Sequence, residues 1–222
     1  MSRAHHLIKA LTESNAIAKL AFTGGTATGK TVLAAAANKL IPATMELGGK
    51  SPLIFCKSVA DHDDAFFDKA VEGAVMFALN QGEICTCPSR FLVHEDIYPK
   101  LMKRIIERTK AIKVGHPLDP STMMGAQASE AQMTKIKTYL EIGKKEGAEV
   151  LCGGGVGKLA DASLGGGYYI EPTIFKGHNK MRVFQEGMHK RSDTLLSTAQ
   201  PAHHPHLFCA PPQQKSSGRW YL

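Results

Sequence analysis

The sequence predicts an α/β fold in which largely parallel sheets are flanked by helices. Two observations lead to it: apolar runs of strand length alternate with longer stretches of helical periodicity, and a glycine turn joins the first strand to the next helix. Hydrophobic residues make up 43% and charged residues 21% of the 222 residues, as in ordinary globular proteins. A chain of this length buries roughly 70% of its unfolded surface, so we expect a real core.

The first part of the chain predicts helix, strand, turn, helix and strand in that order. Apolar residues at near-helical spacing over 5–18 predict a helix, and the apolar run 19–23 predicts a strand that ends at two glycines. Alanine, the best helix former, is frequent in the next predicted helix, 26–40, which Pro42 ends. The apolar segment 44–47 predicts a second strand.

The same alternation continues beyond these elements. A strand is predicted at 52–56, and the acidic residues 61–64 supply the N-terminal charge of a long helix that runs into a cysteine-containing loop. After this loop the pattern predicts strands at 90–94, 150–151 and 168–175, and helices at 97–112 and 129–145.

Residues 187–222 interrupt the pattern. They show no apolar periodicity, and they combine prolines with histidine, serine and glutamine, so we expect this segment to be unstructured. It carries four Lys/Arg and one Asp, which accounts for +3 of the net charge of +7. The remainder is only mildly basic and lacks a cluster of basic and aromatic residues, so no nucleic-acid partner is expected.

The cysteines and the hydropathy pattern suggest where the protein works. Five cysteines form an odd and sparse set, which is typical of free thiols rather than of a disulfide framework. No stretch has the length and apolarity of a secretory core or a membrane span. We therefore expect a cytoplasmic protein without a membrane partner.

The glycine turn between the first strand and the second helix matches a phosphate-binding pattern. Residues 24–31 read Gly, four residues, Gly-Lys-Thr, which is typical of nucleotide triphosphatases. The chemistry is more general, because glycines and a helix N-terminus accommodate any pyrophosphate, including that of a dinucleotide. A triphosphatase also needs an acidic residue after a second strand, whereas Lys57 follows the strand at 52–56. A plain strand-to-helix turn without a ligand is the remaining alternative.

Glu46 and Cys85 are the candidate catalytic residues. Glu46 lies between apolar residues at a predicted strand end, where a buried carboxylate could serve as a base toward water. Cys85 lies on a glycine-containing loop between a helix and a strand, where a substrate can reach it. Alternatively, Glu46 is an ordinary surface carboxylate and Cys85 a small buried residue. Cys85 and Cys87 alone are a weak zinc signal, so no metal is expected.

Together these segments resemble the aldehyde dehydrogenase superfamily, in the order that family shows: residues 22–29, then 46–50, then 83–90. The last of them is most similar to the bacterial acetaldehyde and short-chain aliphatic aldehyde branch. The resemblance covers about residues 5–186 and continues through segments 125–127, 144–148, 167–174 and 181–186.

The resemblance implies a reaction and a role for each candidate residue. Cys85 would attack a small aldehyde, the resulting thiohemiacetal would transfer a hydride to NAD or NADP, and Glu46 would activate the water that hydrolyses the thioester. The backbone N–H of Cys85 would form half of an oxyanion hole. The residues implied to contact the cofactor are Gly24, Gly25, Thr26, Gly29 and Leu47.

The resemblance also implies an incomplete fold. Residues 1–47 would be the end of a dinucleotide-binding domain, 48–186 the beginning of a catalytic domain, and 187–222 a tail foreign to the family. The oxyanion-hole asparagine, the run after Glu186 that binds the nicotinamide ribose and the oligomerisation segment of this homo-oligomeric family have no counterpart in the sequence. We therefore expect the chain to be inactive alone; the alternatives are a non-catalytic remnant or interaction fragment, and a phosphate-loop protein.

Overall fold

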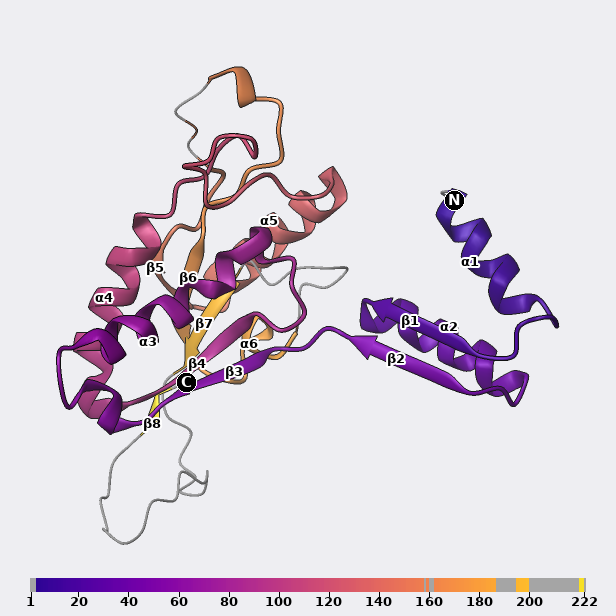
Figure 1. The fold of residues 1–222 in the computed structure, drawn as a ribbon, viewed down its shortest axis with the longest axis horizontal. Coiled ribbons are helices and arrows are strands. Elements are labelled where there is room, and N and C mark those ends of the chain that lie inside the picture. Colours follow the sequence, from indigo (N-terminus) through magenta and orange to yellow (C-terminus); the bar gives the residue numbers. More distant parts are fainter. Residues whose placement is uncertain (1–2, 158, 160–161, 187–194, 200–219, 222) are drawn as a thin grey trace, which may run out of the picture. The chain divides into compact units, whose positions relative to one another are not determined.

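The computed structural model describes residues 3–157, 159, 162–186, 195–199 and 220–221 (Figure 1). The chain divides into two compact units, and the change between them falls between Gly49 and Lys50. This division lies close to the domain change expected at residue 47. Among the described residues, no helix combines the length and the apolarity that a membrane span requires.

The first unit is built around two parallel strands. It contains α1 (Arg3–Glu13), β1 (Leu20–Gly24), α2 (Thr26–Asn38) and β2 (Ala43–Leu47). The strands β1 and β2 pair in parallel, and α2 connects them, as parallel strands require a crossover. Leu20, Val32 and Ala36 are buried between α2 and the sheet. The unit is therefore a small βαβ arrangement.

The second unit is a six-stranded sheet with helices on both faces. Its strands are β3 (Ser51–Phe55), β4 (Pro88–His94), β5 (Glu149–Cys152), β6 (Thr173–Gly177), β7 (Leu195–Ala199) and β8 (Trp220–Tyr221). The strand order is β3-β4-β7-β6-β5, and β8 pairs with β4. The pairs β5-β6 and β4-β8 are antiparallel, and the other pairs are parallel. The predicted α/β class with largely parallel sheets is confirmed.

The helices of this unit are α3 (Ala65–Val75), α4 (Tyr98–Lys110), α5 (Glu130–Lys145) and α6 (Arg182–Gln185), with shorter 3-10 turns at η1 (Lys57–Ala60), η2 (Met76–Gly82), η3 (Glu95–Ile97) and η4 (Ala162–Leu164). Neighbouring residues of β6 show how the layers are arranged. Ile174 belongs to the core under α3 and α4, whereas Phe175 belongs to the core under α5 and α6. Successive side chains of a strand point to opposite faces, so the two helix pairs cover opposite sides of the sheet.

The structure differs from the sequence expectation at strand β7. Residues 195–199 were expected to be unstructured, yet they form a parallel strand between β4 and β6. Backbone hydrogen bonds from two neighbouring strands impose this conformation on a segment without apolar periodicity. The rest of the expected unstructured tail lies outside the described residues, apart from the two residues of β8.

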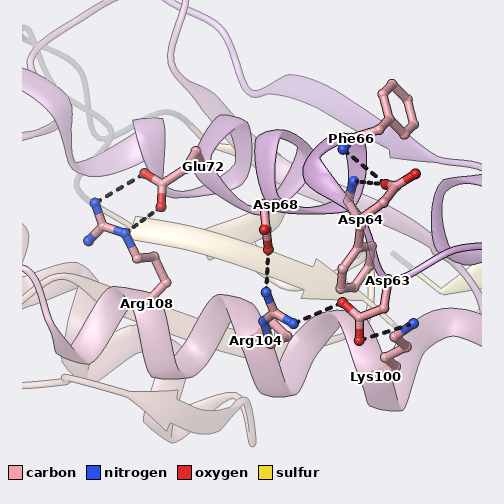
Figure 2. A network of polar contacts seen from close by, with 9 residues as sticks. Asp63, Asp64, Phe66, Asp68, Glu72, Lys100, Arg104 and Arg108 are labelled. Atoms are coloured by element: carbon pink, nitrogen blue, oxygen red, sulfur yellow. Dashed lines mark hydrogen bonds and ion pairs between the residues drawn. The ribbon is translucent and has the colours of Figure 1, made fainter.

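Helices α3 and α4 lie side by side and are joined by ion pairs along their length (Figure 2). Arg104 contacts both Asp63 and Asp68, and the Arg108 guanidinium binds the Glu72 carboxylate through two nitrogens, at 2.5 and 3.1 Å. The acidic groups all come from α3 and the turn before it, and the basic groups from α4. These ion pairs join α3, the helix that leads to Cys85, to α4.

We expect a double-mutant cycle of Glu72→Ala and Arg108→Ala to give a coupling energy of about 0.5–1 kcal/mol. The geometry is favourable, but both side chains are partly exposed, at 55% and 28%, so water and salt screen the pair. Urea unfolding followed by far-UV circular dichroism measures the coupling, which should shrink as salt is added. If the coupling is absent at low salt, the ion pair between Glu72 and Arg108 does not stabilise the fold.

A larger effect is expected at Gly153, which follows β5. Its φ of +68° is left-handed, and a Cβ there would lie 2.3 Å from the Pro172 carbonyl oxygen. Gly153→Ala therefore combines backbone strain with a clash against backbone, and should lower the free energy of unfolding by about 2–4 kcal/mol. Gly73→Ala is the matched control: it lies in α3 with open space around it, so the same change should raise stability by about 0.5–1 kcal/mol.

Candidate active site

The glycine turn lies where β1 passes into α2. Gly25 is the N-cap residue of the helix, in extended conformation (φ −73°, ψ 144°), and no side chain caps the first turn. The first N–H groups of a helix have no intrahelical partner, and the helix dipole favours an anion at this end. The turn thus presents unpaired donors from Thr26 onward.

The same geometry disfavours a phosphate-loop triphosphatase. In such a loop the backbone wraps around the phosphates before the helix begins. Here α2 begins at Thr26, so the residues between Gly25 and Gly29 are already helical, and the Thr31 hydroxyl donates to the Ala27 carbonyl at 3.4 Å. Little loop is left to surround a triphosphate.

Several of the predicted site residues meet at one edge of the first unit. Gly24 pairs with Leu47, and Thr23 pairs with Glu46, at the carboxyl ends of β1 and β2. A Cβ at Gly29 would lie 2.5 Å from Cδ2 of Leu47, so the glycine lets α2 approach β2 closely. In open α/β sheets this edge is where ligands bind.

Glu46 differs from expectation in its burial. The sequence argument for a base required a buried carboxylate, but the structure leaves Glu46 exposed. Its neighbour Met45 packs against the core of this unit. Because side chains alternate along a strand, Glu46 points to the other face. Apolar neighbours in the sequence did not place it in an apolar environment.

Cys85 belongs to the second unit and lies on a tight turn between η2 and β4. The N–H of Cys87 donates to the carbonyl of Ile84 at 3.2 Å, which closes the turn with Cys85 at its corner. The Cys85 side chain is exposed, whereas Cys87 is buried and its thiol contacts the Met76 carbonyl at 3.4 Å. The two cysteines therefore face different environments, and no cluster of three or more His, Cys, Asp or Glu suited to a metal is found among the described residues.

The backbone before this turn is strained. Asn80, Gln81 and Gly82 follow one another with φ of 49°, 60° and 75°, a left-handed conformation that is favourable only for glycine and tolerated by asparagine. For a residue such as glutamine it costs roughly 1–2 kcal/mol. Such strain persists only where the surroundings enforce it.

The enforcing contacts come from a segment 45 residues further along the chain. The Gln81 side-chain amide donates to the Ala126 carbonyl, and the Gln127 amide donates to the Gln81 carbonyl, both at 3.1 Å. The Glu83 carboxylate accepts from the N–H of Ala128 at 3.0 Å. These three hydrogen bonds hold both sides of the strained backbone.

The sequence reasoning missed this group of contacts. Residues 125–127 were noted only as part of a family resemblance, and Gln81 and Glu83 only as neighbours of Cys85. Spacing along the chain cannot pair residues so far apart. The run of asparagine, glutamine and glycine before Cys85 is the one local signal, since glycine and asparagine favour left-handed backbone.

The predicted site residues are thus distributed over both units. The first unit brings together Gly24, Gly25, Thr26, Gly29, Glu46 and Leu47 at one sheet edge. The second unit carries Cys85 on its turn.

Comparison with known proteins identifies the family. The model of the aldehyde dehydrogenase family matches residues 1–189. An aldehyde dehydrogenase of Paracoccus denitrificans is 62% identical over 178 residues, and acetaldehyde dehydrogenase 2 of Cupriavidus necator is 58% identical over 178 residues; each alignment covers 80% of this chain and 35% of the relative.

The solved structures agree with the sequence relatives. A double mutant of betaine aldehyde dehydrogenase from Staphylococcus aureus, in complex with NAD+ and with a BME-modified cysteine, superposes with a TM-score of 0.75 at 32% identity. The match covers 86% of this chain and 37% of that one. The chain thus spans about a third of the length of its relatives, with part of their fold. The chain belongs to the aldehyde dehydrogenase family.

Proposed function

We propose that these residues supply the nucleophile and part of the cofactor site of an NAD(P)-dependent enzyme that oxidises a small aldehyde to a carboxylic acid. The observation that carries the proposal is the exposed Cys85 thiol at the corner of a turn whose backbone is held in a strained conformation. Strain of this kind concentrates at functional sites. Membership of the family gives the type of reaction.

In the proposed reaction the Cys85 sulfur adds to the carbonyl carbon and forms a thiohemiacetal. A nicotinamide cofactor held by the glycine turn at the start of α2 would supply the acceptor for the hydride that leaves this carbon. A thioester on Cys85 remains, and water must hydrolyse it to release the acid and the thiol. Glu46 is proposed to take the proton from this water, and the N–H of Cys85 to stabilise the oxygen that becomes negative.

The sheet edge of the first unit fits the cofactor pyrophosphate. Helix α2 starts without a side-chain cap, so its first N–H groups can donate to an anion. Gly24, Gly25, Thr26 and Gly29 are proposed to contact the phosphates, and Leu47 the nicotinamide portion. The relative that contains NAD+ favours NAD+, while NADP+ is compatible with the same turn.

We further propose that the 222-residue polypeptide does not turn over aldehyde by itself. Large apolar side chains are exposed on the first unit, including Leu7 at 62% and Leu40 at 93%, and its buried core is small. Exposed apolar surface of this kind supports contact with a partner polypeptide. The same observation supports the alternative of a non-catalytic interaction fragment.

A hybrid enzyme distinguishes the enzymatic proposal from the alternative of a non-catalytic interaction fragment. The 178 residues that align with the Paracoccus denitrificans aldehyde dehydrogenase are transplanted into it, and the hybrid is assayed for NAD(P)-dependent oxidation of short aldehydes beside the isolated chain. We expect activity in the hybrid and none in the isolated chain. A correctly folded hybrid without activity would refute the enzymatic proposal and favour the interaction fragment.

A further inference from the structure

We propose that Gln127 is a positioning residue for the Cys85 turn: its side-chain amide holds the backbone of Gln81 in the left-handed conformation that directs the chain into this turn. The inference rests on the proposed role of Cys85 and adds a residue to it. Gln127 lies in the segment between α4 and α5, far from Cys85 in the sequence, and it need not touch substrate or cofactor.

The first argument is the way Gln127 itself is held. Gln127 is only 3% exposed, and its backbone N–H donates to the Tyr168 carbonyl at 2.8 Å. Its amide nitrogen then reaches the Gln81 carbonyl at 3.1 Å. A buried side chain anchored at its own backbone is a rigid support, so the hydrogen bond fixes where the Gln81 carbonyl points.

The second argument is that the supported residue is strained. Gln81 has a φ of 60° between Asn80 and Gly82, which are also left-handed. Glycine adopts this conformation freely and asparagine tolerates it, but glutamine does not favour it. Without an external hydrogen bond the Gln81 backbone is expected to relax, and the turn that carries Cys85 follows it.

The third argument is that the hydrogen bonds form a two-way clamp. Gln81 donates its own amide to the Ala126 carbonyl while its backbone carbonyl accepts from Gln127. On the other side of the strained backbone, Glu83 accepts from the N–H of Ala128. Three contacts between the same two segments fit a device that sets loop geometry.

The test is hydrogen exchange of the full chain, read by mass spectrometry in peptides that span residues 80–87. In Gln127→Ala the amides of Glu83 and Cys87, which bond to the Asn80 and Ile84 carbonyls, should exchange about tenfold faster. Gln185→Ala is the matched control, because it also removes an amide that donates to a backbone carbonyl, away from the turn. It should leave these peptides unchanged.

A rescue pair distinguishes positioning from general packing. Glycine at position 81 removes the strain, whereas alanine removes the same side chain and keeps the strain. In Gln81→Gly/Gln127→Ala the peptides should therefore exchange close to the wild-type rate, and in Gln81→Ala/Gln127→Ala at least as fast as in the single variant. Equal rates in the two double variants, or faster exchange throughout β4 and β6 in Gln127→Ala, would overturn the inference.

The hybrid enzyme supplies the second readout. Gln127→Ala should lower kcat about tenfold, which corresponds to about 1.4 kcal/mol, with KM changed by less than about threefold; Gln81→Gly should restore most of the loss. Faster exchange without a change in kcat overturns the positioning role. Failure of the proposed function can be told apart from failure of this inference. Activity in a hybrid that lacks the Cys85 thiol would refute the proposed function, but it would not change the exchange result.

Discussion

Replacement of Cys85 by serine is expected to abolish aldehyde oxidation by the hybrid enzyme and to lower kcat by at least about 10³-fold. A thiol ionises and attacks a carbonyl far more readily than a hydroxyl does. Serine occupies nearly the same volume and leaves the turn hydrogen bond from Cys87 to Ile84 in place. The loss therefore reports on the sulfur rather than on the fold.

The matched control for this prediction is Cys56→Ser, since Cys56 is a half-buried cysteine on the same unit. It should retain activity within about threefold. Iodoacetamide labelling followed by peptide mapping adds a structural check: of the described thiols, exposed Cys85 should react first and buried Cys87 and Cys152 last. Comparable activity of Cys85→Ser and wild type would exclude Cys85 as the nucleophile.

The fold was predictable where one local rule decided the outcome. Helix α2 was expected over 26–40 and spans Thr26–Asn38, because glycine begins it, alanine fills it and proline follows it. Strand β6 was expected from residue 168 but starts at Thr173, since residues before it make only an isolated bridge from Ile170 to Val156. Strand β7 was missed because its neighbours, not its own sequence, make it a strand.

The candidate site was predictable to the same degree. The glycine turn follows from residue types alone, and its juxtaposition with Leu47 follows from parallel pairing of two adjacent strands. The sequence left open whether Glu46 is buried or an ordinary surface carboxylate, because burial depends on which layers cover a strand face. The clamp on Gln81 was not foreseen, since Gln127 reaches it across the fold. Contacts between segments that are distant in the chain could not be predicted from this single sequence.

Replacement of Glu46 by glutamine is expected to lower steady-state turnover of the hybrid enzyme by about 10²–10⁴-fold, the usual contribution of a general base. Glutamine keeps the size and shape of the side chain but cannot accept a proton from water. The proposed role of Glu46 lies after hydride transfer, in hydrolysis of the thioester. The first turnover should therefore proceed, and a burst of NAD(P)H should precede the slow phase.

The burst also tests whether this carboxylate has a second role, as the base that deprotonates the Cys85 thiol. If Glu46 serves only the water, mass spectrometry of the quenched variant should show one acyl group on Cys85 for each active subunit. If it also deprotonates the Cys85 thiol, the burst should be slowed as well. Glu13→Gln is the control, an exposed carboxylate of the same unit, and should behave as wild type. Because Glu46 is exposed in the chain, a Glu46→Gln variant that turns over at the wild-type rate and accumulates no acyl-enzyme would mean that Glu46 is an ordinary surface carboxylate.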